Sequence, residues 1–427
     1  TDEAMAFIHD SANRPFFCYL SYNAPHSPFQ VADDYFDPYK ASGFDDRVAA
    51  FYGMCKNQDD NVGRLLTHLD ELKLAENTIV LYLTDNGGTA GVKIYNAGMR
   101  GGKTSLHEGG SRVPLFVRWT AANWSPHVVK PITSHIDLYP TILDLCRITP
   151  PAGPPLDGNS LRPLLEGRTD NWPERVLFTH NPIDESNKFP GAVRTERYRL
   201  VRNIKGPSGG SRAKANDASA TPWQLYDMQS DPGETKDLAT EQPQRVARLA
   251  EQYDRWFSDI SRRPLQRFPL PIGHLEHNPV ELHAPQAYFD EPLSFASGPG
   301  FANDWLTNWI DINASIWFDI DVLAAGTYEV ELALACPTAD AGSRVRISVG
   351  DQYVDVTIPA APAEEVLLPH RDELGKTKYR NRCWATLSAG RLQLPAGPGQ
   401  LQLSVMSIAN SQVMDLKHVK LRRQPGQ

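Results

Sequence analysis

The sequence contains no uncharged apolar run near the roughly 20 residues that a membrane-spanning helix needs. It is also poor in cysteine: the five cysteines of the 427-residue chain include no CxxC pair, and none has histidines at zinc-finger spacing. A membrane span and a structural zinc site are therefore not expected. Cys18 and Cys146 stand in apolar runs, which predicts buried free thiols. Cys336 and Cys383 share the late part of the chain, so they are the candidates for a disulfide.

The charge balance lacks a dominant sign. Lys and Arg number 43, Asp and Glu number 51, and the formal net charge is −8, with the charges interspersed rather than in blocks. This pattern argues against a nucleic acid or a charged membrane surface as partner. The stretch from Thr1 to Pro15 lacks both an initiator methionine at its start and a basic-then-apolar leader, so we expect a processed or truncated chain.

The length of 427 residues is enough for two to three domains. Helix-like and strand-like segments alternate through the first third, which is typical of an α/β fold. The expected helices are 2–11, 47–72 and 136–146, and the expected strands are 15–22, 78–84 and 113–119. The run 78–84 is continuously apolar, so we expect a central strand covered on both faces. Asp59 lies on the apolar stripe of helix 47–72, which predicts a buried and paired carboxylate.

Composition and turn signals divide the chain into four segments. They are an α/β unit at 1–150, a small antiparallel sheet with a closing helix at 151–263, a Pro-punctuated linker at 264–292, and a β-sandwich of short alternating runs at 293–427. The last segment is a candidate carbohydrate-binding module. Its tryptophans could form an aromatic platform for sugars or belong to the sandwich core: Trp305, Trp309, Trp317 and Trp384.

Polar residues that could carry chemistry follow the first two expected strands. His26 comes after 15–22, and Asp85 with Asn86 comes after 78–84. Open α/β sheets bind ligands beyond the carboxyl ends of their strands, so these residues mark a candidate site. A carboxylate and an amide oxygen suit Ca²⁺ or Mg²⁺, but a calcium site needs roughly six to eight oxygens. The alternative reading of Asp-Asn-Gly-Gly is a plain turn.

A glycine-rich loop, MRGGKTSLHEGGSRVP, follows at 99–114. Its glycines bracket Lys103, His107 and Glu108 and allow the backbone to approach a ligand closely. A lysine on such a loop offers a point charge for a tetrahedral oxyanion. The alternative is a flexible, solvated basic loop.

Five motifs together resemble the carboxy-terminal half of the catalytic domain of type I, formylglycine-dependent sulfatases, within the alkaline phosphatase superfamily. They are APHSP around His26, LTDNGG around Asp85, GGKTSLHEGGSRVP around Lys103, SHIDLYPTILDLC at 134–146 and LYDMQSDPGETKDLA at 225–239. Their order and spacing are similar to those of the family over roughly residues 1–263. The resemblance implies an alkaline-phosphatase-like α/β fold that lacks its amino-terminal part.

The resemblance also implies roles for single residues. Asp85 and Asn86 would be metal ligands, usually to Ca²⁺, with Mg²⁺ as the alternative. Lys103 would bind a sulfate oxygen, and His26 would contact the sulfate or protonate the departing alcohol. His107 would contact the substrate, although relatives often carry tyrosine at its position.

The family's nucleophile is missing from this sequence. Sulfatases use a formylglycine made within a C/S-x-P/A-x-R motif, an Asp pair that completes the metal site, and a further Lys and His, and none of these is present. Cys336 begins CPTAD but lacks the arginine, and Asp59-Asp60 lie in an expected helix rather than at a strand end. The family places the missing parts upstream of Thr1. We therefore expect the 427 residues alone to be inactive and prone to associate through a half-built sheet.

The resemblance predicts a sulfuric ester hydrolase that removes sulfate from a carbohydrate or aryl sulfate ester, in the periplasm or outside the cell. The alternatives are a phosphodiesterase or phosphonate hydrolase of the same superfamily, and a non-catalytic glycan-binding protein. The sequence does not name the sulfated substrate or the oligomeric state. We expect His274, His277 and His283 to be surface residues, and His135 with Asp137 to cap and pack a helix start.

Overall fold

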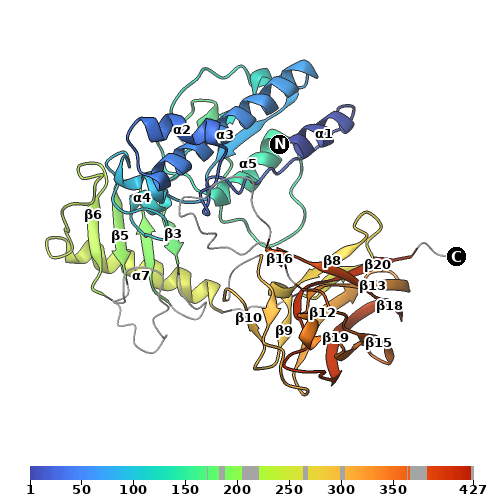
Figure 1. The fold of residues 1–427 in the computed structure, drawn as a ribbon. Helices are drawn as coiled ribbons and strands as arrows, with labels where there is room; N and C mark the ends of the chain where they lie inside the picture. The colour runs from blue at the N-terminus through green and yellow to red at the C-terminus, as the bar shows by residue number, and fades with distance from the viewer. Residues whose placement is uncertain are drawn as a thin grey trace. The chain divides into compact units, whose positions relative to one another are not determined.

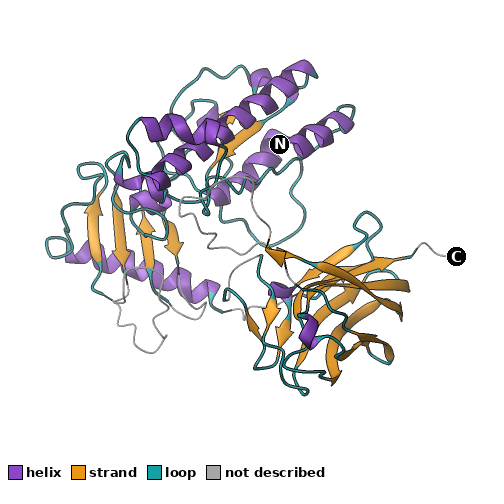
Figure 2. Cartoon of the chain, in the orientation of Figure 1, coloured by secondary structure: helices purple, strands orange, loops and turns teal. Residues whose placement is uncertain are grey.

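The computed structural model describes residues 1–170, 172–181, 188–203, 221–262, 268–298, 303–362, 364–365 and 382–424. The chain divides into two compact units, one over Thr1–Pro264 and one built from the described residues that follow (Figure 1). The first unit mixes helices and strands, while strands dominate the second (Figure 2). The expected combination of a mixed α/β part and a β-sandwich is confirmed. No helix in the described ranges is long and apolar enough to cross a membrane.

Helices make up most of the first half of the first unit. They are α1 (Asp2–Asp10), α2 (Asp33–Ala41), α3 (Asp46–Glu71), α4 (Glu108–Ser111), α5 (Leu138–Leu145) and α6 (Arg162–Leu165), with 3₁₀ turns η1 (Ala75–Asn77), η2 (Ala90–Lys93), η3 (Thr120–Ala122) and η4 (His135–Asp137) between them. The Asp45 side chain caps α3 by accepting from Val48 N at 2.8 Å. Asp59 is exposed, so the prediction of a buried carboxylate is wrong. Burial in α3 is concentrated in its first third, and after Lys56 only Leu69 is fully buried.

The strand after α3 belongs to a small sheet rather than to the centre of a large one. β1 (Val80–Leu83) pairs antiparallel with β2 (Leu115–Arg118) in a two-stranded sheet. Leu83 of β1 and Phe116 of β2 keep 36% and 64% of their surface exposed. The prediction of a strand covered on both faces is therefore wrong for the described residues.

The apolar run 15–22 forms no strand. Phe17 and Tyr19 are 69% and 81% exposed, and the thiol of Cys18, predicted to be buried, is exposed as well. An apolar run becomes a strand only where a neighbouring strand takes its backbone hydrogen bonds. In the described residues, β1 and β2 pair only with each other, which leaves this run without such a neighbour.

The second half of the first unit is a four-stranded antiparallel meander covered by a helix. The strands are β3 (Leu177–His180), β4 (Gly191–Arg194), β5 (Tyr198–Arg202) and β6 (Gln224–Asp227), in that order, and α7 (Pro243–Ile260) runs along them (Figure 1). β4 and β5 form a hairpin, closed by Thr195 N donating to Tyr198 O at 2.8 Å. Tyr253 of α7 is fully buried among Val193, Leu200 and Leu225 of this sheet.

Asp137 has the capping and packing role that the sequence predicts. It is buried at the start of α5, and its carboxylate accepts from Ser134 N at 2.8 Å and Asn159 N at 2.9 Å. Arg175 donates to the same carboxylate at 2.6 and 2.7 Å. The pair is bidentate, so Asp137 ties three separate segments together. Cys146, just after α5, is exposed rather than buried.

The second unit is a β-sandwich built from two larger sheets. Its strands are β7 (Leu270–Ile272), β8 (Val280–His283), β9 (Tyr288–Phe289), β10 (Ser294–Phe295), β11 (Leu306–Thr307), β12 (Ser315–Val322), β13 (Gly326–Ala335), β14 (Arg344–Val349), β15 (Gln352–Thr357), β16 (Glu364–Glu365), β17 (Arg382–Cys383), β18 (Ala385–Leu394), β19 (Gly397–Ser407) and β20 (Asp415–Arg423), with 3₁₀ turns η5 (Ala284–Gln286) and η6 (Thr338–Asp340). One sheet has the order β10-β11-β20-β13-β18 with β8 on β20, and the other β15-β14-β19-β12-β7 with β9 on β12. Alternate residues of β12 and β13 face a common apolar core.

The sandwich starts earlier than predicted. Residues 264–292 were expected to be a linker, yet β7 pairs with β12, β8 pairs with β20, and β9 pairs with β12. These strands have only two to four residues, so no alternation marks them, and they exist because longer strands take their hydrogen bonds. Cys336 is buried and Cys383 exposed, and both are free thiols, so the disulfide is not formed.

Candidate functional site

Two backbone hydrogen bonds join the turn after β1 to the glycine-rich loop. Gly87 N donates to Gly110 O at 3.0 Å, and Lys103 N donates to Gly88 O at 3.0 Å. Position 87 has no room for a side chain, because a Cβ there would lie 1.8 Å from Gly109 O. The turn and the loop are thus in direct contact. The turn carries Asp85 and Asn86, the predicted metal ligands, and the loop carries Lys103, the predicted sulfate-binding residue.

The loop that carries His26 packs on the same helix as the turn after β1. The Phe29 ring lies 5.5 Å from the Phe51 ring of α3, measured between centroids. Gly91, which follows the turn, lies against the rings of Phe51 and Tyr52. All three predicted motifs therefore gather around the first half of α3. Within the described ranges, no hydrogen bond or ion pair joins His26 to the other two motifs.

The side chains predicted to form the site are open to a ligand. Asp85 is exposed, and Asn86 and Lys103 are half-buried. In the part of the chain that the structure describes, nothing pairs with the Asp85 carboxylate or the Lys103 ammonium group. His26 is exposed, and its Nδ1 lies 2.7 Å from Ser27 O. Because a carbonyl only accepts, Nδ1 carries the proton and Nε2 remains for another partner.

Asp85 and Asn86 offer the right kind of ligand atom for calcium but too few ligand atoms. Their carboxylate and amide oxygens are the hard donors that Ca²⁺ and Mg²⁺ prefer, yet a calcium site needs roughly six to eight oxygens. The group of three metal-type ligands found among the described residues lies in the sandwich instead: Glu281, His283 and His418. The two oxygen donors of this turn are therefore too few to form a calcium site by themselves.

His107 forms a buried hydrogen bond with Glu234 that sequence reasoning missed. It is 8% exposed, and its Nδ1 lies 2.5 Å from Glu234 Oε2, in the loop after β6. Glu234 Oε1 accepts from Glu108 N at 2.6 Å, so one carboxylate fixes two consecutive residues of the glycine-rich loop. With its ring so engaged and buried, His107 anchors the loop, which argues against the predicted substrate contact.

Arginines extend this network to the small sheet. Arg199 of β5 pairs with the buried carboxylate of Glu108 and donates to Leu106 O at 2.7 Å. Arg100 of the loop donates to the Tyr226 hydroxyl at 2.8 Å. Burial raises the pKa of this phenol, with the Arg100 charge opposing the shift, so the hydroxyl is neutral and can accept. The loop that carries Lys103 is thus fixed to β5 and β6 by charge-assisted hydrogen bonds.

A signal for this network was present in the sequence. Glu234 belongs to the DPGETKDLA run, and His107 and Glu108 belong to the glycine-rich loop, so both partners stood within motifs that the sequence had already singled out. The paired residues lie more than 120 positions apart in the sequence. Neither the periodicity of a segment nor the spacing within a motif predicts a contact over that distance.

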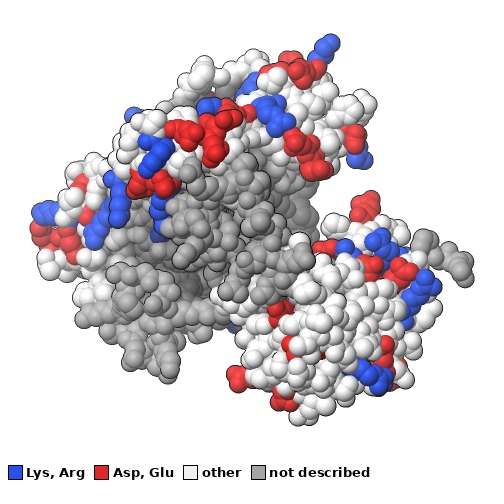
Figure 3. All heavy atoms as spheres, viewed as in Figure 1, with Lys and Arg blue, Asp and Glu red and all other residues white. Residues whose placement is uncertain are grey.

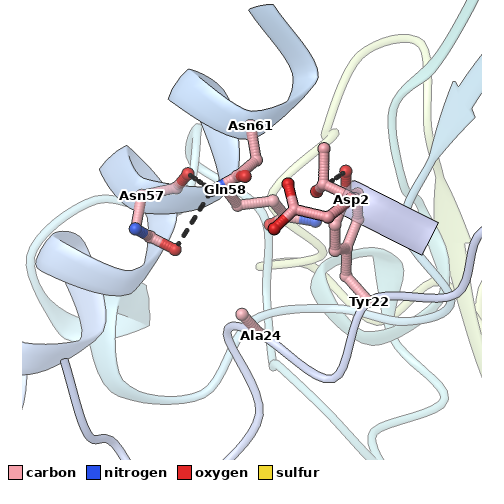
Figure 4. A pocket seen from close by; sticks show the side chains of 7 residues that line it. Asp2, Tyr22, Ala24, Asn57, Gln58 and Asn61 are labelled. Atoms are coloured by element: carbon pink, nitrogen blue, oxygen red, sulfur yellow. Dashed lines mark hydrogen bonds between the residues drawn. The ribbon is translucent and has the colours of Figure 1, made fainter. Parts of the chain in front are cut away.

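An open pocket of about 270 Å³ lies between the start of α1, the segment before His26 and the middle of α3 (Figure 4). It is lined by Thr1, Asp2, Tyr22, Ala24, Asn57, Gln58 and Asn61. Its walls are mainly amide and carboxylate groups, and Asn61 Nδ2 donates to Asn57 O at 2.9 Å. None of the predicted site residues lines it, so the pocket adds no residue to the candidate site.

The close contact at Gly87 gives a testable expectation. Replacing Gly87 with alanine should lower the free energy of unfolding of the first unit by about 1–3 kcal/mol, because the new methyl group collides with backbone. Gly63 in α3 is the matched control, since nothing lies within 4 Å of a Cβ there. Gly63→Ala should stabilise the helix by up to about 1 kcal/mol. Urea unfolding of both variants decides, and equal stability of the two would contradict the close packing.

Comparisons with known proteins place residues 1–258 among one group of enzymes. The family model described as Sulfatase matches residues 1–148, and the model described as N-sulphoglucosamine sulphohydrolase, C-terminal, matches residues 102–258. Mouse steryl-sulfatase is 30% identical over 273 residues, which cover 59% of this chain and 42% of that protein. Human arylsulfatase A is 30% identical over 251 residues, 55% of this chain and 47% of that protein.

A third curated relative and one solved structure extend the comparison. Human N-acetylgalactosamine-6-sulfatase is 32% identical over 177 residues, 40% of this chain and 33% of that protein. The crystal structure of Ps i-CgsB in complex with k-i-k-neocarrahexaose has a TM-score of 0.50 at 26% identity and covers 60% of this chain and 54% of that one. The chain spans less than half the length of these curated relatives.

Proposed function

Because this chain belongs to the sulfatase family over residues 1–258, we propose that it is part of an enzyme that hydrolyses sulfate esters. The observation that carries the proposal is the bonded contact between the turn of Asp85 and Asn86 and the loop of Lys103. That contact brings the backbone of a hard-ligand turn beside a lysine whose ammonium group pairs with nothing among the described residues. Sulfuryl oxygens need both kinds of group.

We propose a sulfated carbohydrate or an aryl sulfate as the substrate. The names of the relatives, N-acetylgalactosamine-6-sulfatase and arylsulfatase A, support these two classes. The oligosaccharide in the similar crystal structure supports the carbohydrate. A periplasmic or extracellular location is proposed from the family resemblance alone.

In this proposal the residues of the chain hold the sulfate group and supply a proton. Lys103 pairs with a sulfuryl oxygen through its free ammonium group. His26, with Nδ1 bonded to Ser27 O, gives a proton from Nε2 to the departing alcohol when the ring is charged. Asp85 and Asn86 would provide two oxygen ligands to Ca²⁺ or Mg²⁺, and an ion there would stabilise negative charge on the sulfuryl group.

We propose that a formylglycine is the nucleophile and that it is encoded outside these 427 residues. The sequence has no C/S-x-P/A-x-R motif and no second carboxylate pair at a strand end. We assign His107 to holding the loop, because Glu234 occupies its ring.

Sulfate release from an aryl sulfate and from a sulfated oligosaccharide tests the function. The 427-residue chain alone should release no sulfate, whereas the same residues joined to the rest of the catalytic domain should do so. The phosphate ester of the same alcohol is the comparison substrate. Faster hydrolysis of the phosphate would favour the phosphodiesterase alternative, and turnover by the 427 residues alone would refute the missing nucleophile.

A further inference from the structure

One row of side chains crosses the outer face of the sheet β15-β14-β19-β12 with β9 at its edge. The register places neighbours directly opposite each other: Tyr288 faces Trp317, Trp317 faces Gln402, Gln402 faces Ser348, and Ser348 faces Tyr353. Directly opposite residues share one face of a sheet. The five side chains therefore form a continuous row, which at about 4.8 Å per strand spacing is about 19 Å long.

This row lies outside the sandwich core. Along β12 the residues on either side of Trp317 in sequence, Ile316 and Phe318, are fully buried, so Trp317 faces the other way. Trp317, Gln402 and Ser348 are half-buried, and Tyr353 is 56% exposed. The row therefore belongs to the outer surface of the sandwich and not to its core.

The row has two aromatic rings at one end, two neutral polar groups in the middle and one aromatic ring at the other end. Tyr288 and Trp317 stack at one end with ring centroids 5.8 Å apart and planes 10° apart. Gln402 and Ser348 follow, with amide and hydroxyl groups that both donate and accept. Tyr353 ends the row. Sugar rings present the complementary pattern, with apolar C–H faces for aromatic rings and hydroxyl groups for amides.

The charged side chains on this face disfavour binding of a highly sulfated polymer. Arg346 in the adjacent row is held by Asp355 through two hydrogen bonds of 2.7 and 2.9 Å. Asp319 accepts from Gln400, and Asp321 also points outward from β12. Arg344 lies 3.9 Å from the same Asp355 carboxylate, so two guanidinium groups share this face with the three carboxylates of Asp319, Asp321 and Asp355. The excess of carboxylates would repel sulfate groups. Figure 3 shows a broad surface of the second unit that carries few Lys, Arg, Asp or Glu atoms.

The other tryptophans that the sequence offered as a platform lie elsewhere. Trp309 is fully buried and donates from Nε1 to Ala314 O at 2.9 Å, as a core residue does. Trp305 is 6% exposed and packs edge-on against Trp384. The partly exposed tryptophan on the regular sheet face is Trp317.

We propose that this outer face binds uncharged sugar units of a polysaccharide. Tyr288 and Trp317 provide the stacking surfaces, and Gln402, Ser348 and the hydroxyl of Tyr353 bond to sugar hydroxyl groups. The Tyr353 ring itself carries the Arg346 guanidinium, 3.9 Å from its centroid. The sandwich would hold the enzyme on a polymer that also carries the sulfate esters, a consequence that rests on the proposed function. The binding itself does not depend on it.

Affinity electrophoresis of the full 427-residue chain tests the binding. The probes are neutral polysaccharides (agarose, xylan, galactomannan and a mixed-linkage β-glucan) and two sulfated ones (carrageenan and heparin). At least one neutral polymer should retard the chain, and Trp317→Ala should weaken that binding about tenfold. Tyr353→Ala and Gln402→Ala should weaken it as well. Tyr95→Ala, which removes a ring 78% exposed in the first unit, is the control and should change nothing.

The outcomes separate this binding from catalysis, since no step requires sulfate release. Circular dichroism and the surface variant Tyr353→Ala accompany Trp317→Ala, so that lost binding is distinguished from an unfolded sheet. Retardation by sulfated polymers only, retardation unaffected by all three face variants, or no retardation by any polymer would each overturn the proposal. A change of oligomeric state in the face variants without loss of glycan binding would also overturn it, and would assign the face to a second copy.

Discussion

Replacing Glu234 with alanine should lower the free energy of unfolding of the first unit by about 3–5 kcal/mol, the usual cost of removing one partner from a buried ion pair. The Glu234 side chain is fully buried, and it accepts from His107 and from Glu108 N. Its loss would leave the buried imidazole and a buried backbone N–H without an acceptor, next to the buried guanidinium of Arg199. The glycine-rich loop should separate from the small sheet.

The matched control is Glu241→Ala. Glu241 pairs with Lys236 at 2.9 Å, but both side chains are more than half exposed, so its removal should cost less than about 1 kcal/mol. Two units unfold here, so the stability of the first is best read from hydrogen exchange of peptides over 98–112 during a urea series. Equal effects of the two substitutions would show that the buried pair does not hold the loop.

Replacing Lys103 with alanine should lower kcat/KM for sulfate esters by about 10²–10³ in the complete catalytic domain, the usual effect of removing one charged or hydrogen-bonding group from a developing oxyanion. The backbone of Lys103 is fixed by its bond to Gly88 O, while nothing in the described chain pairs with its ammonium group. The substitution therefore removes a charge without removing an internal contact. Stability should stay within about 0.5 kcal/mol of the parent.

Lys93→Ala is the control for Lys103→Ala. Lys93 is an exposed lysine in η2, which lies close to the same loop in sequence, and its loss should change kcat/KM by less than about threefold. Lys103→Arg keeps the charge but changes its geometry, and should retain part of the activity. If Lys103→Ala kept more than a tenth of the parent activity, the lysine would not bind the reacting sulfate group.

Long, regularly patterned elements could be predicted from the sequence. The helix at 47–72 appears as α3, the closing helix of the segment 151–263 as α7, and the alternating runs after 293 as the sandwich. Each carries its own period over many residues, so local pattern and tertiary burial agree. The sequence could equally point to Asp137 as a helix cap, because capping acts within four residues.

Features that depend on distant partners could not be predicted. The apolar run at 15–22 reads as a strand, but apolar content records a preference for burial and not the presence of a neighbouring strand. The short strands β7 and β8 were missed for the opposite reason. Neither has an alternating pattern of its own, and each is a strand because it takes part in the hydrogen bonding of a longer strand, β12 or β20.

The candidate site divides along the same line. The candidacy of Lys103, Asp85 and Asn86 was predicted from the sequence because these residues stand within short motifs. The role of His107 was not, because it is set by Glu234, 127 residues further along the chain. A motif identifies residues that could bind a ligand. The structure shows which of them, such as His107, already bind another residue of the chain.

The ion pairs between the glycine-rich loop and the small sheet have a consequence for heat inactivation. Because His107 and Glu108 are tied to Glu234 and Arg199, the loop cannot leave its place until that sheet opens. The position of the lysine is then maintained by a hydrophobic core that it never touches, the one centred on Tyr253. An enzyme built this way should lose activity at the temperature at which α7 separates from its sheet, well after exposed segments of the first unit have begun to exchange their amide protons.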